Sequence, residues 1–147
     1  MASHRRRIAA RALKQEDGFS LIELLVVLII IGVLAAIGIA IFTAQQNKAN
    51  DADAKTGARS AQTAMETYFV DHRSYTGASV AELETIQPSL GDAPNLAVRL
   101  AGSNQFQLDT TSESTSPVIF RVVRTASGTI TRSCAPAGTG GCKDGTW

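Results

Sequence analysis

The chain has 147 residues, and its charges nearly cancel, with 14 Lys and Arg residues against 13 Asp and Glu residues. A nearly neutral chain gives no general electrostatic argument for nucleic-acid binding. The length suffices for one small domain beside the long apolar segment near the amino terminus, but it excludes two such domains.

The basic residues are concentrated at the amino terminus. Residues 1–18 hold five basic side chains and two acidic ones, and residues 21–42, which follow, are almost entirely apolar. As a helix, this apolar segment would extend about 33 Å, enough to cross a bilayer core of about 30 Å. Because basic flanks stay in the cytoplasm, we expect one membrane-spanning helix with the carboxyl-terminal part of the chain outside.

Glu23 lies within the start of this apolar segment. A charge at the centre of a bilayer costs at least about 2.5 kcal/mol, and such a charge normally indicates function. The carboxylate could snorkel to the nearby cytoplasmic interface, or it could pair with a positive group. The residue itself leaves both interpretations open.

The segment around Glu23 resembles a known processing signal. The chain has a basic leader that ends in Gly18, followed by Phe19, with Glu23 just before a long apolar helix. This arrangement resembles the signature of type IV pilins and type II secretion pseudopilins. In that family a prepilin peptidase cuts after the glycine and methylates the new amino terminus. The resemblance implies cleavage between Gly18 and Phe19, N-methylation of Phe19, and a mature chain of residues 19–147. It also implies that Glu23 pairs with the Phe19 amine of a neighbouring subunit during assembly.

Two other interpretations of the amino terminus are a secretory signal and an uncleaved anchor. A small-x-small cleavage pattern does occur at residues 38–40, but the apolar core of a secretory signal has about 7–15 residues, fewer than here. Gly32 and Gly38 are candidate hinge positions in the helix, or they only allow close helix packing. Many family members have a proline at the position of Ala40, so local melting of the helix is in question.

The helix is predicted to continue beyond the membrane through residues 43–71. Small or apolar residues recur there at the three-and-four spacing of one buried helix face. These residues are Ala54, Ala58, Ala61, Met65 and Tyr68. Gly57 is the predicted weak point of the helix.

Residues 72–147 are predicted to form a small α+β region. Ser79 and Glu82 have the spacing of a capping box, which predicts a short helix over residues 80–86 and a loop over 88–94. Strand patterns follow at residues 95–100, 105–110, 118–124 and 129–134, with hairpin turns at 101–104 and 126–128. We therefore predict an α+β, pilin-like fold in which the long amino-terminal helix packs against an antiparallel sheet of about four strands.

The two cysteines, Cys134 and Cys142, lie in the predicted exported part. An even number of cysteines outside the cytoplasm favours a disulfide. A zinc site is the alternative, but no third and fourth ligands cluster nearby. By resemblance, such a loop is typical of the variable surface region of pilins.

Enzyme, metal and cofactor chemistry find little support. His4 and His72 are the only histidines, and the GTGGCK sequence at residues 138–143 lacks the glycine spacing of a phosphate loop. Asp51 and Asp53 mimic the start of a calcium loop without the required glycine or distal Glu, so we expect both to be solvated. We predict no catalytic residue, no metal site and no cofactor.

Calcium and DNA remain weaker alternatives. Major pseudopilins often hold calcium in the sheet region, where Asp109, Glu113 and Asp144 could supply oxygen atoms. Three arginines on adjacent predicted strands could bind DNA as in a competence pilin, although alternating solvent-facing residues are the simpler interpretation. These are Arg121, Arg124 and Arg132.

The sequence therefore predicts a structural, non-enzymatic subunit of a type IV pilus filament. It would stay in the cytoplasmic membrane in contact with lipid, be processed by prepilin peptidase, and join a homo-oligomeric surface filament through the inner-membrane assembly machinery. The alternatives are a type II secretion pseudopilin, a competence pilin that takes up DNA, and a membrane-anchored binding module that never polymerises.

Overall fold

The computed structural model of the protein describes residues 18–147. The predicted leader lies outside the described residues except for Gly18. The chain divides into two units between Gly38 and Ile39, and each is considered by itself.

One long helix, α1, runs over Leu21–His72. It begins after Ser20, whose carbonyl oxygen accepts the backbone N–H groups of Glu23 at 3.0 Å and Leu24 at 3.2 Å. The α-helix continues without interruption through all three of its glycines. It ends one residue beyond the predicted boundary, where Arg73 takes a φ of 56° and leaves the helical conformation.

The five residues of the predicted helix face are all buried, so this prediction is confirmed. Gly57, the predicted weak point, lies in an uninterrupted part of α1. It is buried, and a Cβ atom at this position would lie 2.9 Å from the Cβ of Ala93. The absent side chain lets the segment before the sheet approach α1 closely.

Two short helices connect α1 to the sheet. The capping box is confirmed: α2 covers Val80–Ile86, and the Ser79 side chain accepts the backbone N–H of Glu82 at 3.3 Å. Residues 88–94 were predicted to be a loop, but Pro88–Asp92 form a 3₁₀ helix, η1. Proline is favoured at the first turn of a helix because its φ is already suitable, and the buried Leu90 anchors the turn.

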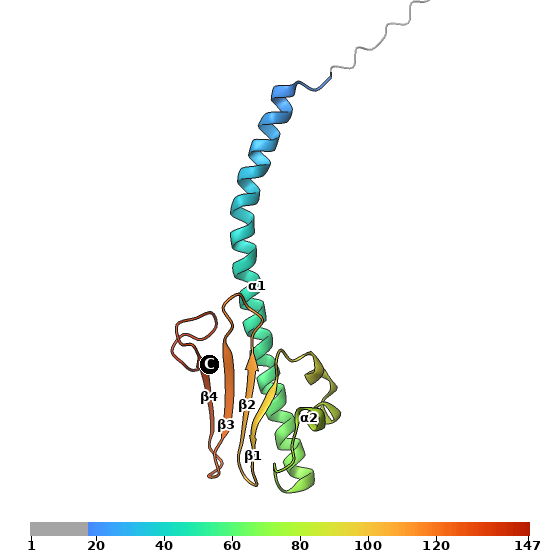
Figure 1. The fold of residues 1–147 in the computed structure, drawn as a ribbon, viewed down its shortest axis with the longest axis vertical. Helices are drawn as coiled ribbons and strands as arrows, with labels where there is room; N and C mark the ends of the chain where they lie inside the picture. Colours follow the sequence, from blue (N-terminus) through green and yellow to red (C-terminus); the bar gives the residue numbers. More distant parts are fainter. Residues whose placement is uncertain (1–17) are drawn as a thin grey trace, which may run out of the picture. The chain divides into compact units, whose positions relative to one another are not determined.

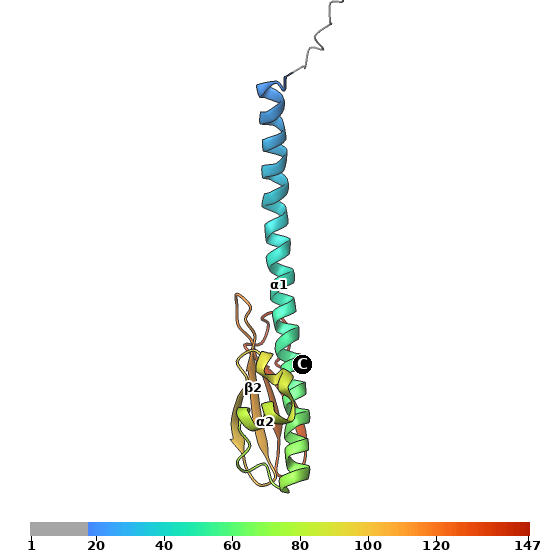
Figure 2. The ribbon, with the colours of Figure 1, turned by 90° about the vertical axis from the view of Figure 1, so that its right-hand side faces the viewer.

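The four strands form one antiparallel sheet in the order β1-β2-β3-β4 (Figure 1). Their bounds, within two residues of the predicted ones, are Ala97–Ala101, Phe106–Thr111, Ile119–Arg124 and Ile130–Ala135. The sheet lies against one side of the carboxyl-terminal part of α1 (Figure 2). The predicted α+β, pilin-like fold class is confirmed.

The core lies between α1 and the inner face of the sheet. Near the end of α1, a first cluster joins Ala61, Met65 and Tyr68 to Phe106 and Leu108. A second cluster joins the alanine at position 54 to the two cysteines and to apolar residues at the start of β3. Every buried residue of α1 lies at or after position 51, so this core is built without the apolar segment.

Candidate processing and assembly site

The predicted cleavage site lies just before α1. Gly18 and the Phe19 side chain, which is 80% exposed, precede the helix and are accessible to a peptidase. Glu23 lies in the first turn of α1, where the partial positive charge of the helix amino terminus favours a carboxylate. Within residues 18–147, Glu23 makes no ion pair.

The apolar part of α1 has no protein cover. Its large side chains from Leu24 to Phe42 are between 43% and 70% exposed. In the described part of the chain, α1 is the single helix that is long and apolar enough to cross a membrane. Apolar surface of this extent requires lipid or other helices around it.

The two predicted hinge glycines have open surroundings. No atom lies within 4 Å of a Cβ placed at Gly32 or Gly38, beyond the local backbone of the helix. The absence of a side chain at either position therefore leaves room for a neighbouring helix to approach. A bend at these glycines stays a prediction.

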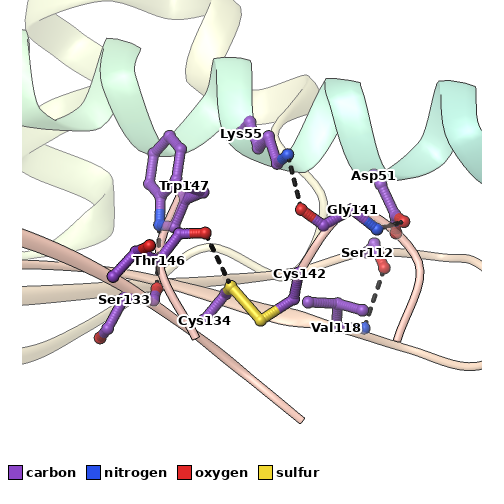
Figure 3. The surroundings of a disulfide bond; sticks show 10 residues. All are labelled: Asp51, Lys55, Ser112, Val118, Ser133, Cys134, Gly141, Cys142, Thr146 and Trp147. Carbon is purple, nitrogen blue, oxygen red and sulfur yellow. Dashed lines mark hydrogen bonds between the residues drawn. A yellow bond between two sulfur atoms is a disulfide. The ribbon is translucent and has the colours of Figure 1, made fainter. Parts of the chain in front are cut away.

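The disulfide between Cys134 and Cys142 is confirmed, with the two Cα atoms 5.6 Å apart (Figure 3). Its loop is attached to α1 through the peptide of Gly141. Lys55 Nζ donates to the Gly141 carbonyl oxygen at 2.9 Å, and Asp51 Oδ2 accepts the Gly141 N–H at 2.7 Å. The loop thus lies firmly against the helix.

Asp51 was predicted to be solvated, which is wrong, whereas Asp53 is exposed as predicted. Asp51 is 3% exposed, because the cysteine loop covers it and supplies a backbone donor. Sequence reasoning also missed Asn47 and Asn50. Asn47 Oδ1 accepts the N–H of Thr115 at 2.9 Å, and Asn50 Nδ2 donates to the carbonyl of residue 113 at 2.9 Å. These contacts hold the polar loop between β2 and β3 against α1.

The three arginines do not lie on one face of the sheet, so they do not form the common basic patch considered for DNA binding. Arg121 lies on the outer face of the sheet, where it donates to both carboxylate oxygens of Asp109, at 2.7 and 2.8 Å. The other two lie on the face toward α1. Arg124 is 3.7 Å from a Glu66 oxygen, and Arg132 donates to Gln62 at 2.8 Å.

The remaining candidate residues are separate from one another. His72 ends α1, is exposed, and stacks on Tyr68 with the ring centroids 4.0 Å apart. In residues 18–147, the carboxylates considered for calcium do not belong to a group of three potential metal ligands. Asp109 is instead engaged by Arg121 and Arg99. Calcium binding itself stays untested.

Comparison with known proteins finds a match at the amino-terminal part of the chain, which contains Gly18, Phe19 and Glu23. The prokaryotic N-terminal methylation motif matches residues 13–39. The type IV major pilin protein PilA of Myxococcus xanthus (strain DK1622) is 41% identical over 59 residues, which cover 40% of this chain and 27% of that protein. The matched region is thus little more than a quarter of the curated relative, and no solved structure matches significantly. By its methylation motif and this similarity, the amino-terminal part of the chain is similar to type IV pilins.

Proposed function

We propose that the chain is a structural subunit of a type IV pilus, and that it is not an enzyme. The observation that carries this proposal is the uncovered apolar part of α1, with Glu23 in its first turn and Gly18-Phe19 just before it. A helix with this surface needs lipid before assembly and other helices afterwards. We infer that it anchors the subunit in the cytoplasmic membrane, with the carboxyl terminus outside.

Processing would create the group that assembly requires. Cleavage after Gly18 by prepilin peptidase on the cytoplasmic side would give Phe19 a new amine, which is then methylated and remains cationic. In an apolar filament core, a lone Glu23 carboxylate is costly, and pairing with this amine of a neighbouring subunit would lower the cost. The pair would also set the register between adjacent helices.

Each part of the chain would then have a place in the filament. The apolar part of α1 would pack against the same helix of other subunits, driven by van der Waals contacts between the helices. The sheet and the disulfide loop would form the outer surface. The inner-membrane pilus machinery would add each subunit from the lipid phase.

The first test is mass spectrometry of sheared surface filaments combined with electron microscopy. The proposal expects surface pili whose subunits begin at N-methylated Phe19. Short periplasmic fibres in place of surface pili would instead favour a secretion pseudopilin. An uncleaved leader in the intact mass would contradict the proposal and favour a permanently anchored binding protein.

The second test is the variant Glu23→Ala, which removes the carboxylate and keeps the apolar helix. We expect normal cleavage but at least about a tenfold lower filament yield, because a cationic amine would be left unpaired in the core. The matched control is Glu82→Ala, which removes an exposed carboxylate from α2. Wild-type filament yield from a fully processed Glu23→Ala chain would contradict the assigned role.

A further inference from the structure

The carboxyl-terminal part of α1 separates two surfaces of opposite charge. We call the first the basic flank, formed by Arg59 and Arg132 around Trp147 and by Lys55 over Phe120. We call the second the acidic groove, formed by Asp53, Asp92 and Glu113. Apart from the hydrogen bond of Lys55 to the disulfide loop, neither surface has a part in the processing and assembly site described above.

Aromatic rings hold the basic flank in place. The guanidinium groups of Arg59 and Arg132 lie 5.4 and 5.6 Å from the centre of the Trp147 ring, and Lys55 Nζ lies 5.1 Å from that of Phe120. Trp147 is itself fixed, because its ring N–H donates to the Ser133 carbonyl at 2.9 Å. Within residues 18–147, none of the three cations makes an ion pair. Lys55 Nζ is already bound to the Gly141 carbonyl, so the guanidinium groups of Arg59 and Arg132 are the ordered charges available to a partner.

The acidic groove runs between α1 and η1. Its first cavity, of about 110 Å³, is lined by the three carboxylate residues, and a second of about 380 Å³ shares Asp53 and Asp92 with it. Gly57, Ser60 and other small residues line the second cavity and leave space for a long side chain. In the described part of the chain, the three carboxylates are exposed and make no ion pair.

The two surfaces lie on different sides of the helix. Asp53 and Lys55 are two residues apart, which turns their side chains by about 200° around a helix of 3.6 residues per turn. Accordingly, β4 lies beside the basic flank, and the segment of α2 and η1 lies on the other side of α1 (Figure 1). One copy therefore cannot bring its own two surfaces together.

We propose that the basic flank of one subunit docks into the acidic groove of the next copy of the same chain. Two different patches that complement each other make a heterologous contact, and repetition of such a contact without ring closure builds a helical filament. Both sets of unpaired charges are then satisfied by one interaction. This inference rests on the proposed pilin function and adds a specific contact between the exported parts of the subunits.

Charge reversal tests the contact in the full-length chain. The flank-reversed chain carries Arg59→Glu and Arg132→Glu, and the groove-reversed chain carries Asp53→Lys and Asp92→Lys. Each chain repels itself at the contact, so each should give at least about tenfold fewer sheared filaments than wild type. A single chain with all four substitutions, and a mixture of the two reversed chains in one cell, should both restore the yield.

Controls separate this contact from folding and from the pilin function itself. Arg73→Glu and Glu84→Lys reverse charges elsewhere and should leave the yield unchanged. Each variant should keep wild-type cleavage and the wild-type thermal unfolding midpoint. Absence of filaments from the processed wild-type chain contradicts the proposed function, whereas wild-type yield from both reversed chains contradicts only this contact.

The remaining outcomes also decide against the contact. If all reversed chains fold and are processed but neither combination restores assembly, the two surfaces are not complementary to each other. If only the flank-reversed chain loses yield, the basic flank binds another anionic partner. Retention of labelled DNA by wild-type but not flank-reversed filaments would then identify that partner as nucleic acid.

Discussion

Asp109 on β2 is a buried charge that is stabilised by arginines on the two neighbouring strands, Arg121 on β3 and Arg99 on β1. Burial by itself would raise the pKa of this carboxyl group, but the hydrogen bonds and charge of Arg121, with a smaller effect of Arg99, lower it below the ordinary value of 3.8. The hydrogen bonds that Arg121 donates to Asp109 likewise raise the pKa of Arg121. The paired, ionised form therefore contributes to folding.

We predict that Asp109→Asn lowers the free energy of unfolding by about 1–2 kcal/mol at neutral pH, a value reduced by the partial exposure of Arg121. Because the pKa of Asp109 is lower in the folded state, its stabilisation is present above the unfolded-state pKa and is lost as pH falls through the folded-state pKa. Wild type and variant should thus converge in acid. Urea unfolding across this pH range measures the difference. Equal stability at neutral pH would contradict the prediction.

Tyr75 has the opposite pH dependence. Burial, and then the 2.8 Å hydrogen bond that its hydroxyl donates to Glu66, raise the pKa of Tyr75 to about 12. The protonated hydroxyl therefore stabilises the fold below pH of about 10, the unfolded-state pKa. This contribution is lost as pH rises from about 10 through the folded-state value.

We predict that wild-type stability falls by about 2 kcal/mol between these two pKa values, and that Tyr75→Phe removes most of this fall. At neutral pH the same substitution should cost about 1 kcal/mol, because it breaks the hydrogen bond to Glu66. Denaturant unfolding at several alkaline pH values provides the measurement, with Tyr68→Phe as the matched control. If Tyr75→Phe loses as much stability at alkaline pH as wild type does, the titrating group is not Tyr75.

At the scale of elements, the carboxyl-terminal loop depends on α1 as much as on its own disulfide. Asp51 and Lys55 are one helical turn apart and engage the two sides of the same Gly141 peptide. Gly140 adopts a φ of 49°, and a side chain there would collide with Asp51. A glycine is thus required where the loop approaches the helix.

We predict that replacing both cysteines by alanine lowers the free energy of unfolding by about 2–3 kcal/mol, the estimate for a closed loop of this size. The sheet should persist, because its main core cluster near the end of α1 does not include the cysteines. Circular dichroism during thermal unfolding measures both effects, and wild type under reducing conditions is the comparison. Complete unfolding at room temperature would contradict an accessory role for the loop.

At the scale of the whole molecule, the two parts of α1 require different surroundings. The amino-terminal part is apolar and uncovered, while the later part buries one face against the sheet. The core of the second part contains no residue from the first. The apolar segment is therefore separable from the folding of the later part of the chain.

We predict that residues 43–147 fold without the apolar segment. This truncated chain should be soluble without detergent, retain the Cys134–Cys142 disulfide, and unfold within a few degrees of the full-length chain in detergent. Gel filtration, thiol titration and thermal unfolding measure these properties. Aggregation or loss of the cooperative transition would indicate that the apolar segment supports the fold.

Local patterns in the sequence predicted most of the elements. The helix face from Ala54 to Tyr68, the Ser79 cap and the four strands follow from periodicity and capping, which act over only a few residues. The position of Glu23 after Gly18-Phe19 likewise gave the resemblance to the methylation motif, which matches residues 13–39. The placement of Arg121 and Arg124 on opposite faces of the sheet also follows from the sequence. Successive residues of a strand point to alternate faces, and these two are three residues apart.

Only the tertiary structure determined which distant residues meet. Asp51 is separated by 90 residues from the Gly141 N–H that it accepts, and no local pattern in the sequence connects the two. Gly57 became a close contact because the segment at Ala93 folds back onto α1. The sequence by itself determined the long apolar segment, the elements and their buried faces, whereas tertiary packing decided which charges are buried, paired or unpaired. The physical reason is that helix and strand patterns depend on near neighbours, while burial and ion pairing depend on segments that approach only in the folded chain.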